Sequence, residues 1–216
     1  RIYRELAVLI GNERGLADSF ISQALSLAIP SLSIAGILEL QLSACALVEA
    51  IVASYFDYDT SVVDDLREQI AKLPSARRNL RTFRVSGKNV SVRLPCALLV
   101  RVLNIVGGRL SSIENSDACS RSPDELRNGA FRLALRVVDE LVARSLRDRD
   151  QDHRIVFQTF LDDILVLFSL PEWPSADLIV QAVGIRFVMM LKKGSDMNVY
   201  TRSSALDTLG VIAARV

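Results

Sequence analysis

A run of basic residues near the middle of the chain has the composition of a phosphate-binding surface. Residues 76–110 contain eight Arg and Lys side chains and no Asp or Glu, so this segment carries +8. The residues before it carry −5 and those after it −2, which leaves the whole chain at only +1. Guanidinium and ammonium groups donate charge-assisted hydrogen bonds to phosphate oxygens. The sequence therefore predicts a local contact with an anionic partner that the overall composition conceals.

Six cations in the first half of this run are the candidate nucleic-acid contacts. They are Arg77, Arg78, Arg81, Arg84, Lys88 and Arg93. We expect these cations to contact double-stranded DNA. The run has little aromatic content beyond Phe83, whereas single-strand binding relies on aromatic side chains that stack on bases. Nothing in the run is expected to read base edges, so the contacts should be with phosphates. Two other interpretations stay open: an acidic face of a protein partner, or ion pairs within the chain. The acids available for such pairs are Asp57, Asp59, Asp64, Asp65 and Glu68.

No motif in the sequence indicates a catalytic site. There is no phosphate-binding P-loop, no G-x-S-x-G and no paired-histidine motif. His153 is the single histidine and sits in a charged run without a Cys or His nearby, so it is not expected to bind a metal. Cys45, Cys96 and Cys119 are odd in number and far apart, which favours reduced thiols. The sequence therefore predicts a binding protein that is not an enzyme and holds no cofactor or metal.

Hydrophobic periodicity predicts helices on both sides of the basic run. Half of the residues are hydrophobic and only 6% are aromatic, a composition that favours helix over sheet. The predicted helices span 2–10, 16–29, 31–56, 60–73, 95–113, 123–146, 155–169, 176–193 and 197 onward. The clearest start is Ser122, a cap residue followed by Pro123 and two acids. Inside the basic run, alternation over 82–94 predicts a short β-hairpin that turns at 86–89.

Three further features have structural interpretations. Residues 19–38 carry no charge and are long enough to span a bilayer, but Pro30 and frequent serines favour two buried helices instead, and no membrane contact is expected. Trp173, between two predicted helices, is expected to be a packing wedge. The arginines of the 123–146 helix do not form one stripe, so they are expected on a solvated face.

The spacing of the helices predicts the architecture. Helix pairs recur about every 40 residues, which is the HEAT/armadillo period, and short connections make successive helices antiparallel. The sequence therefore predicts an all-α fold: an α-solenoid of HEAT-like antiparallel helix pairs with one short β-hairpin or extended basic insertion near 82–94. An irregular helical bundle is the alternative. The expected parts are net acidic HEAT-like helices over 1–75, the basic hairpin or loop over 76–94, and HEAT-like helices over 95–216 that continue beyond the chain.

Two blocks near the end of the chain resemble a known family. PEWPSADL at 171–178 and SSALDTLGVIAAR at 203–215 are similar to the HEAT-repeat body of Nipped-B-type cohesin loaders, and ARRNLRTFRV at 76–85 resembles it less closely. The resemblance implies a fragment of a nuclear, chromatin-associated loader. Such a loader binds double-stranded DNA without sequence specificity and contacts cohesin subunits, namely the ATPase heads or hinge and the kleisin. It promotes cohesin loading and stimulates the cohesin ATPase without being an ATPase itself.

The same resemblance implies one partner that this chain is not expected to hold. Nipped-B-type loaders bind a tetratricopeptide partner through an extended region outside the residues present here. The rival function is a generic HEAT or armadillo scaffold or transport adaptor, which binds peptides in its concave groove. Steep salt dependence of DNA binding is expected to distinguish the loader from the adaptor.

Overall fold

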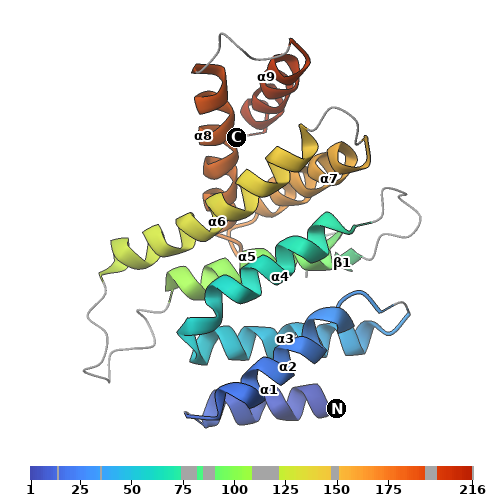
Figure 1. The fold of residues 1–216 in the computed structure, drawn as a ribbon, viewed down its shortest axis with the longest axis vertical. Coiled ribbons are helices and arrows are strands. Elements are labelled where there is room, and N and C mark those ends of the chain that lie inside the picture. Colours follow the sequence, from blue (N-terminus) through green and yellow to red (C-terminus); the bar gives the residue numbers. More distant parts are fainter. Residues whose placement is uncertain are drawn as a thin grey trace.

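The computed structural model describes residues 1–13, 15–34, 36–73, 82–84, 91–108, 122–146, 151–192 and 199–215. Within these ranges the regular elements are helices and two short strands, joined by turns, and the helices stack along one long axis from α1 to α9 (Figure 1). The helices are α1 (Ile2–Asn12), α2 (Asp18–Ser31), α3 (Leu38–Ser54), the short 3-10 helix η1 (Phe56–Tyr58), α4 (Asp59–Ala71), α5 (Leu94–Gly108), α6 (Pro123–Ser145), α7 (Gln151–Phe168), α8 (Ala176–Lys192) and α9 (Val199–Ala213). The strands are β1 (Thr82–Arg84) and β2 (Ser91–Arg93).

The helices form two layers, as a solenoid of helix pairs requires. Helices α1, α3, α5 and α7 contact one another in sequence along one layer, and α2, α4, α6 and α8 do so along the other. Figure 1 shows α4 in front of α5 and α6 in front of α7. The predicted all-α solenoid is therefore confirmed.

A continuous apolar core runs between the two layers. It extends from Ile10 of α1 to Ala205 of α9, with Phe160 and Phe187 among its largest fully buried side chains. Helix α3 is buried on several sides because it packs against α1, α2 and α5. Each fully buried large aliphatic or aromatic side chain stabilises the fold by about 1.5–3 kcal/mol relative to an exposed one.

The predicted helix over 31–56 is wrong at its start. Ser31 does not cap it: this residue ends α2, and its Oγ donates to the carbonyl oxygen of Leu27 at 2.7 Å. Gly36 adopts a φ of +84°, which L side chains rarely take, and α3 begins only at Leu38. The Gln41 Nε2 then donates to the carbonyl oxygens of Leu32 and Ile34, at 2.9 and 3.0 Å. These hydrogen bonds satisfy two carbonyl groups in the connection between α2 and α3, which the sequence pattern predicts to be helical.

The predicted start of α6 is confirmed. The Ser122 Oγ accepts a hydrogen bond from the Glu125 backbone N–H at 3.2 Å, and a Glu125 carboxylate oxygen accepts one from the Ser122 N–H at 2.8 Å. This reciprocal pair satisfies two of the donors that every helix start leaves open. Helix α7, by contrast, begins at Gln151 rather than at the predicted residue 155.

The two strands correspond to the ends of the predicted 82–94 hairpin. They pair antiparallel, with Thr82 opposite Arg93, Phe83 opposite Val92, and Arg84 opposite Ser91. Residues 85–90, which include the predicted turn, lie outside the described residues. The chain enters α5 directly after Arg93, so β2 is continuous with the helical stack.

The described helices also answer the question of membrane insertion in part. Among them, no single helix is both long and apolar enough to cross a membrane. The segments Leu38–Ser54 and Phe56–Ala71 meet that test only as a pair, and they are bent by 116° where they join.

Candidate nucleic-acid interface

The structure describes two of the six predicted DNA contacts. Arg77, Arg78, Arg81 and Lys88 lie outside the described residues. The backbone of Arg84 forms the end of β1, but its side chain is not described. Arg93 is described in full, and it does not project outward.

The side chain of Arg93 turns into the protein instead of toward a partner. Its Nη1 donates to the Asp163 Oδ1 at 2.6 Å and to the carbonyl oxygen of Thr159 at 3.0 Å. The Arg93 backbone N–H donates to the other oxygen, Oδ2, of the same carboxylate at 3.0 Å. Only 16% of the Arg93 side chain and 6% of the Asp163 side chain are exposed. Arg93, one of the six predicted DNA contacts, is therefore held by a buried carboxylate on α7 and is not presented to a partner.

The Asp163 carboxylate is buried but well supplied with donors. It faces the Arg93 guanidinium, the Arg93 N–H and the thiol of Cys96. Burial raises the pKa of Asp163, while the hydrogen bonds from Arg93 act in the opposite direction. Burial also raises the pKa of Cys96 well above its usual value, so this thiol stays protonated and can donate to the carboxylate.

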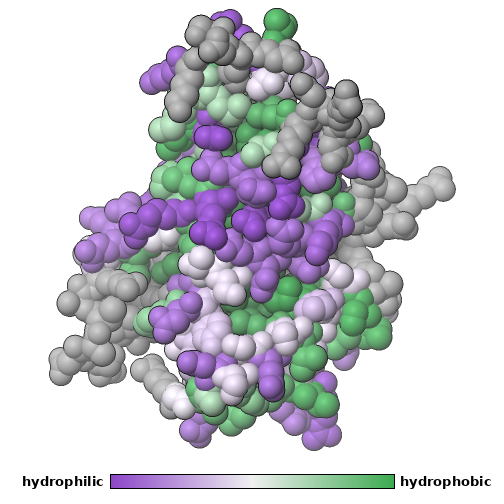
Figure 2. All heavy atoms as spheres, in the orientation of Figure 1, coloured by the Kyte–Doolittle hydropathy of each residue, from purple (hydrophilic) through white to green (hydrophobic). Residues whose placement is uncertain are grey.

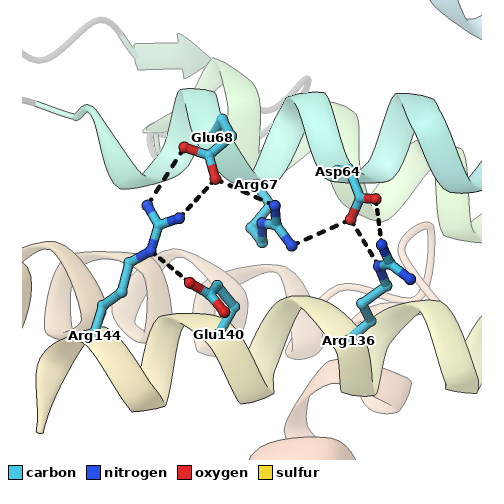
Figure 3. A network of polar contacts seen from close by, with 6 residues as sticks. All are labelled: Asp64, Arg67, Glu68, Arg136, Glu140 and Arg144. Carbon is cyan, nitrogen blue, oxygen red and sulfur yellow. Dashed lines mark hydrogen bonds and ion pairs between the residues drawn. The ribbon is translucent and has the colours of Figure 1, made fainter.

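The α4 and α6 helices are linked by a second set of charged contacts. Its members are Asp64, Arg67 and Glu68 of α4 and Arg136, Glu140 and Arg144 of α6 (Figure 3). Arg136 contacts both oxygens of Asp64, at 2.8 and 2.6 Å, and Arg144 contacts Glu68 at 2.7 Å. Arg67 lies between Asp64 and Glu68, at 3.2 Å from each. These three basic and three acidic groups neutralise one another across two neighbouring repeats.

The solvated face expected of the α6 arginines holds for Arg127 and Arg136, whose side chains are 63% and 53% exposed while they pair with Asp177 of α8 and Asp64 of α4. Arg144 departs from it, because its side chain is only 22% exposed and pairs with Glu68 of α4. For Asp64 and Glu68, pairing within the chain does occur, but the described partners belong to α4 and α6 rather than to the basic run.

An open groove of about 1340 Å³ runs beside the network, between walls from α4, α6 and α8. Its charged lining residues are Asp59, Arg67, Glu125, Arg132, Arg136, Asp139, Glu140 and Arg186. Basic and acidic groups are equal in number, so the groove has no net attraction for phosphate. Figure 2 shows the matching band of hydrophilic surface across the face formed by α4 and α6. Several of these charged groups already pair within the chain, as Arg67 and Arg136 do with Asp64 and Arg186 does with Asp139.

The described cysteines carry no reactive chemistry. Burial, followed by the nearby Glu49 carboxylate, raises the pKa of Cys45 to about 12. Cys45 and Cys96 are buried free thiols, and a thiol held protonated is a poor nucleophile and metal ligand. Within the described ranges, no cluster of three or more His, Cys, Asp or Glu side chains could hold a metal ion.

Comparison with known proteins gives one consistent result. The chain is 27% identical to the human Nipped-B-like protein in an alignment of 216 positions, which covers 93% of this chain and 8% of that protein. It is 25% identical over 179 residues to the sister chromatid cohesion protein mis4 of Schizosaccharomyces pombe, covering 72% of this chain and 11% of the relative. No family model matches. The chain is homologous to a segment of the Nipped-B-type cohesin loaders.

A solved loader structure has the same fold. The C-terminal fragment of the cohesin loader SCC2 from Chaetomium thermophilum superposes with a TM-score of 0.77 over 99% of this chain, at 20% identity. The chain covers 17% of that structure. The predicted resemblance to the loader family is thus confirmed, for a segment that is a small part of each relative.

The anchor of β2 is a feature of this chain that sequence reasoning missed. Asp163 occupies a position on the apolar side of α7, near the buried Phe160 and Leu167 at helical spacing. A carboxylate on an apolar helix face is the available signal, because a buried charge requires a partner. The sequence alone does not identify Arg93 as that partner, since 70 residues separate the two.

The α4–α6 network predicts an acid-sensitive contact. Hydrogen bonds from Arg144 lower the pKa of Glu68 below its usual 4.5. A carboxylate with a lowered folded-state pKa stabilises the fold above the unfolded pKa, and this contribution is lost as the pH falls through the folded pKa. We therefore expect the free energy of unfolding, measured with urea, to fall less in Glu68→Gln than in the wild type as the pH drops below about 4.5.

The size of this effect is limited by exposure. The Glu68 side chain is 37% exposed, so solvent screening keeps the contribution below about 1 kcal/mol. Glu172→Gln is the matched control, since Glu172 is exposed and has no ion pair among the described residues. An equal acid response in both variants would contradict the role of Glu68.

Proposed function

We propose that this chain is a non-catalytic binding segment of a cohesin loader, which contributes to the loading of cohesin and so to sister-chromatid cohesion. The observation that carries the proposal is the concentrated +8 charge of residues 76–110 in a chain homologous to loaders over 93% of its length. In this function the segment contacts chromosomal DNA and cohesin subunits in the nucleus. The loader stimulates the cohesin ATPase without hydrolysing ATP itself.

The proposed DNA contact is the basic segment without Arg93. Its cations are Arg77, Arg78, Arg81, Arg84 and Lys88. Arg93 is left out because its guanidinium already bonds to Asp163 and Thr159. Binding is through the phosphate backbone, so it does not depend on base sequence and weakens steeply with salt.

The α4–α6–α8 groove is the proposed place for a protein contact. Its balanced charges fit a polypeptide of mixed charge, and Arg132 on α6 is an exposed cation at its edge. This division assigns nucleic acid to the basic segment and a cohesin subunit to the groove. The same groove is the feature that favours a peptide-binding adaptor as the second candidate function.

Charge reversal tests the DNA contact and separates the two functions. In the full-length protein, replacing Arg77, Arg78, Arg81 and Arg84 with Glu is expected to weaken binding to duplex DNA. The slope of log K against log salt should fall by up to about one unit for each lost phosphate contact. The measurement is a salt titration of DNA binding by fluorescence anisotropy.

A control variant keeps the change in total charge the same. It replaces Arg4, Arg132, Lys192 and Arg202 with Glu, all exposed and without ion pairs among the described residues. This variant should retain most of the wild-type slope. A folded basic-segment variant with an unchanged slope would overturn the assignment of the site, and weak, salt-insensitive binding by the wild type would favour the adaptor.

A further inference from the structure

The base of the β1–β2 ribbon is held from both sides. Consecutive residues of a strand point to opposite faces, yet Val92 is fully buried and only 16% of the Arg93 side chain is exposed. The strand is therefore packed on one face by the apolar core and bonded on the other by α7. An isolated two-stranded ribbon of three residues per strand is not stable in water, so these contacts must hold it.

Asp163 fixes Arg93 at two points. One carboxylate oxygen accepts from the Arg93 guanidinium at 2.6 Å, and the other accepts from the Arg93 backbone N–H at 3.0 Å. A bond to the side chain alone would leave the strand free to rotate, whereas two bonds to one residue fix the orientation of its peptide. Thr159, one turn earlier on α7, accepts a third bond from the same guanidinium.

This anchor lies at the junction between the basic segment and the solenoid. Thr82 pairs with Arg93 across the ribbon, so a fixed Arg93 also fixes the residue at which β1 begins, directly after Arg81. Leu94, which follows Arg93, is buried and begins α5. The orientation of β2 is thus tied to α5 through the chain and to α7 through the carboxylate.

We infer that Asp163 is a positioning residue, which orients the base of the basic β1–β2 segment on the solenoid by binding the backbone and side chain of Arg93. Asp163 itself does not contact the partner. It fixes the orientation of β2 and, through the pairing with Arg93, of Thr82 at the start of β1. Only the DNA-binding part of this inference rests on the proposed function.

Replacement of Asp163 with asparagine distinguishes positioning from simple charge. Asp163→Asn removes a negative charge near the basic segment, so electrostatics alone predicts unchanged or tighter DNA binding. Positioning predicts the opposite, because an amide cannot accept both Arg93 bonds as a carboxylate does. Asp162→Asn is the matched control: it makes the same charge change on the adjacent, exposed residue, whose ion pair with Arg215 is a long 3.9 Å contact.

The experiment has two readouts on the full-length protein. Hydrogen exchange of the β1 and β2 amides, taken relative to α3 core amides and without DNA, measures the anchor. We expect Asp163→Asn to raise this ratio by about tenfold or more, and Asp162→Asn to leave it unchanged. DNA affinity at fixed salt should fall several-fold in Asp163→Asn and should not fall in Asp162→Asn.

The outcomes separate the anchor from the proposed DNA contact. Unchanged relative exchange in Asp163→Asn overturns the inference. If exchange rises but no variant, wild type included, binds DNA, the anchor stands and the proposed function fails. If Asp163→Asn does not fold, Arg93→Lys is used, since it keeps the charge and the backbone bond. It should raise the exchange ratio by a smaller factor, and no rise would overturn the inference.

Discussion

Replacement of Trp173 with alanine is expected to lower the free energy of unfolding by about 3–5 kcal/mol, the usual cost of removing a large buried aromatic side chain. Only 6% of Trp173 is exposed, and it lies in the turn between α7 and α8. Its ring is 5.5 Å from the guanidinium carbon of Arg101, which belongs to α5. The side chain therefore joins three helices, and its loss leaves a cavity that none of them can fill alone.

A hydrogen bond also links the turn around Trp173 to α5. The Ser175 backbone N–H donates to the Asn104 side-chain oxygen at 2.8 Å, which is one neutral hydrogen bond worth about 0.5–1.5 kcal/mol. Apolar burial of the indole and its contact with the Arg101 cation add to this bond. The expected packing role of Trp173 thus follows from its burial, and the loss on truncation should be large.

Urea unfolding followed by circular dichroism measures this loss. Tryptophan fluorescence is unsuitable, because Trp173 is the only tryptophan of the chain. Trp173→Phe is the matched variant: it keeps an aromatic ring and should cost clearly less than Trp173→Ala. A loss below about 1 kcal/mol for Trp173→Ala would show that the turn does not depend on the indole.

The helices could be predicted because their signals are local. Ser122 and Glu125 are three residues apart in sequence, so the start of α6 is readable without any knowledge of the fold. The start of α3 was missed because it depends on the bonds from Gln41 to two carbonyl groups, which only the folded connection brings together. The solenoid could be predicted too, because each helix pair of a repeat fold contacts mainly the pairs next to it in sequence.

The charged contacts could not be predicted in the same way. The basic run is visible in composition, but the partner of an individual arginine is a matter of tertiary structure. Arg136 and Asp64 are 72 residues apart, and Arg93 and Asp163 are 70 apart. Charge counting therefore treated Arg93 as equivalent to Arg84, although β2 places Arg93 against α7. Composition predicts the sign of the charge on a surface, but the packing of the chain determines which cations remain exposed on it.

The Arg93–Asp163 pair is expected to behave as a buried ion pair in which each charge offsets the cost of burying the other. Either Arg93→Met or Asp163→Leu alone leaves one charge uncompensated in the interior, which typically costs about 3–5 kcal/mol. The double replacement removes both charges at once. It should therefore recover most of the loss, with a coupling of several kcal/mol between the two positions.

Recovery in the double variant should be incomplete for a definite reason. The Arg93 backbone N–H donates to Asp163 at 3.0 Å, and the leucine side chain introduced by Asp163→Leu offers it no acceptor, so a deficit of about 1–3 kcal/mol should remain. The double replacement is favourable in one respect, because it removes the buried Arg93 Nε, which has no hydrogen-bond partner in the described part of the chain. Urea unfolding of the four proteins closes the cycle, and strictly additive losses would contradict the pairing.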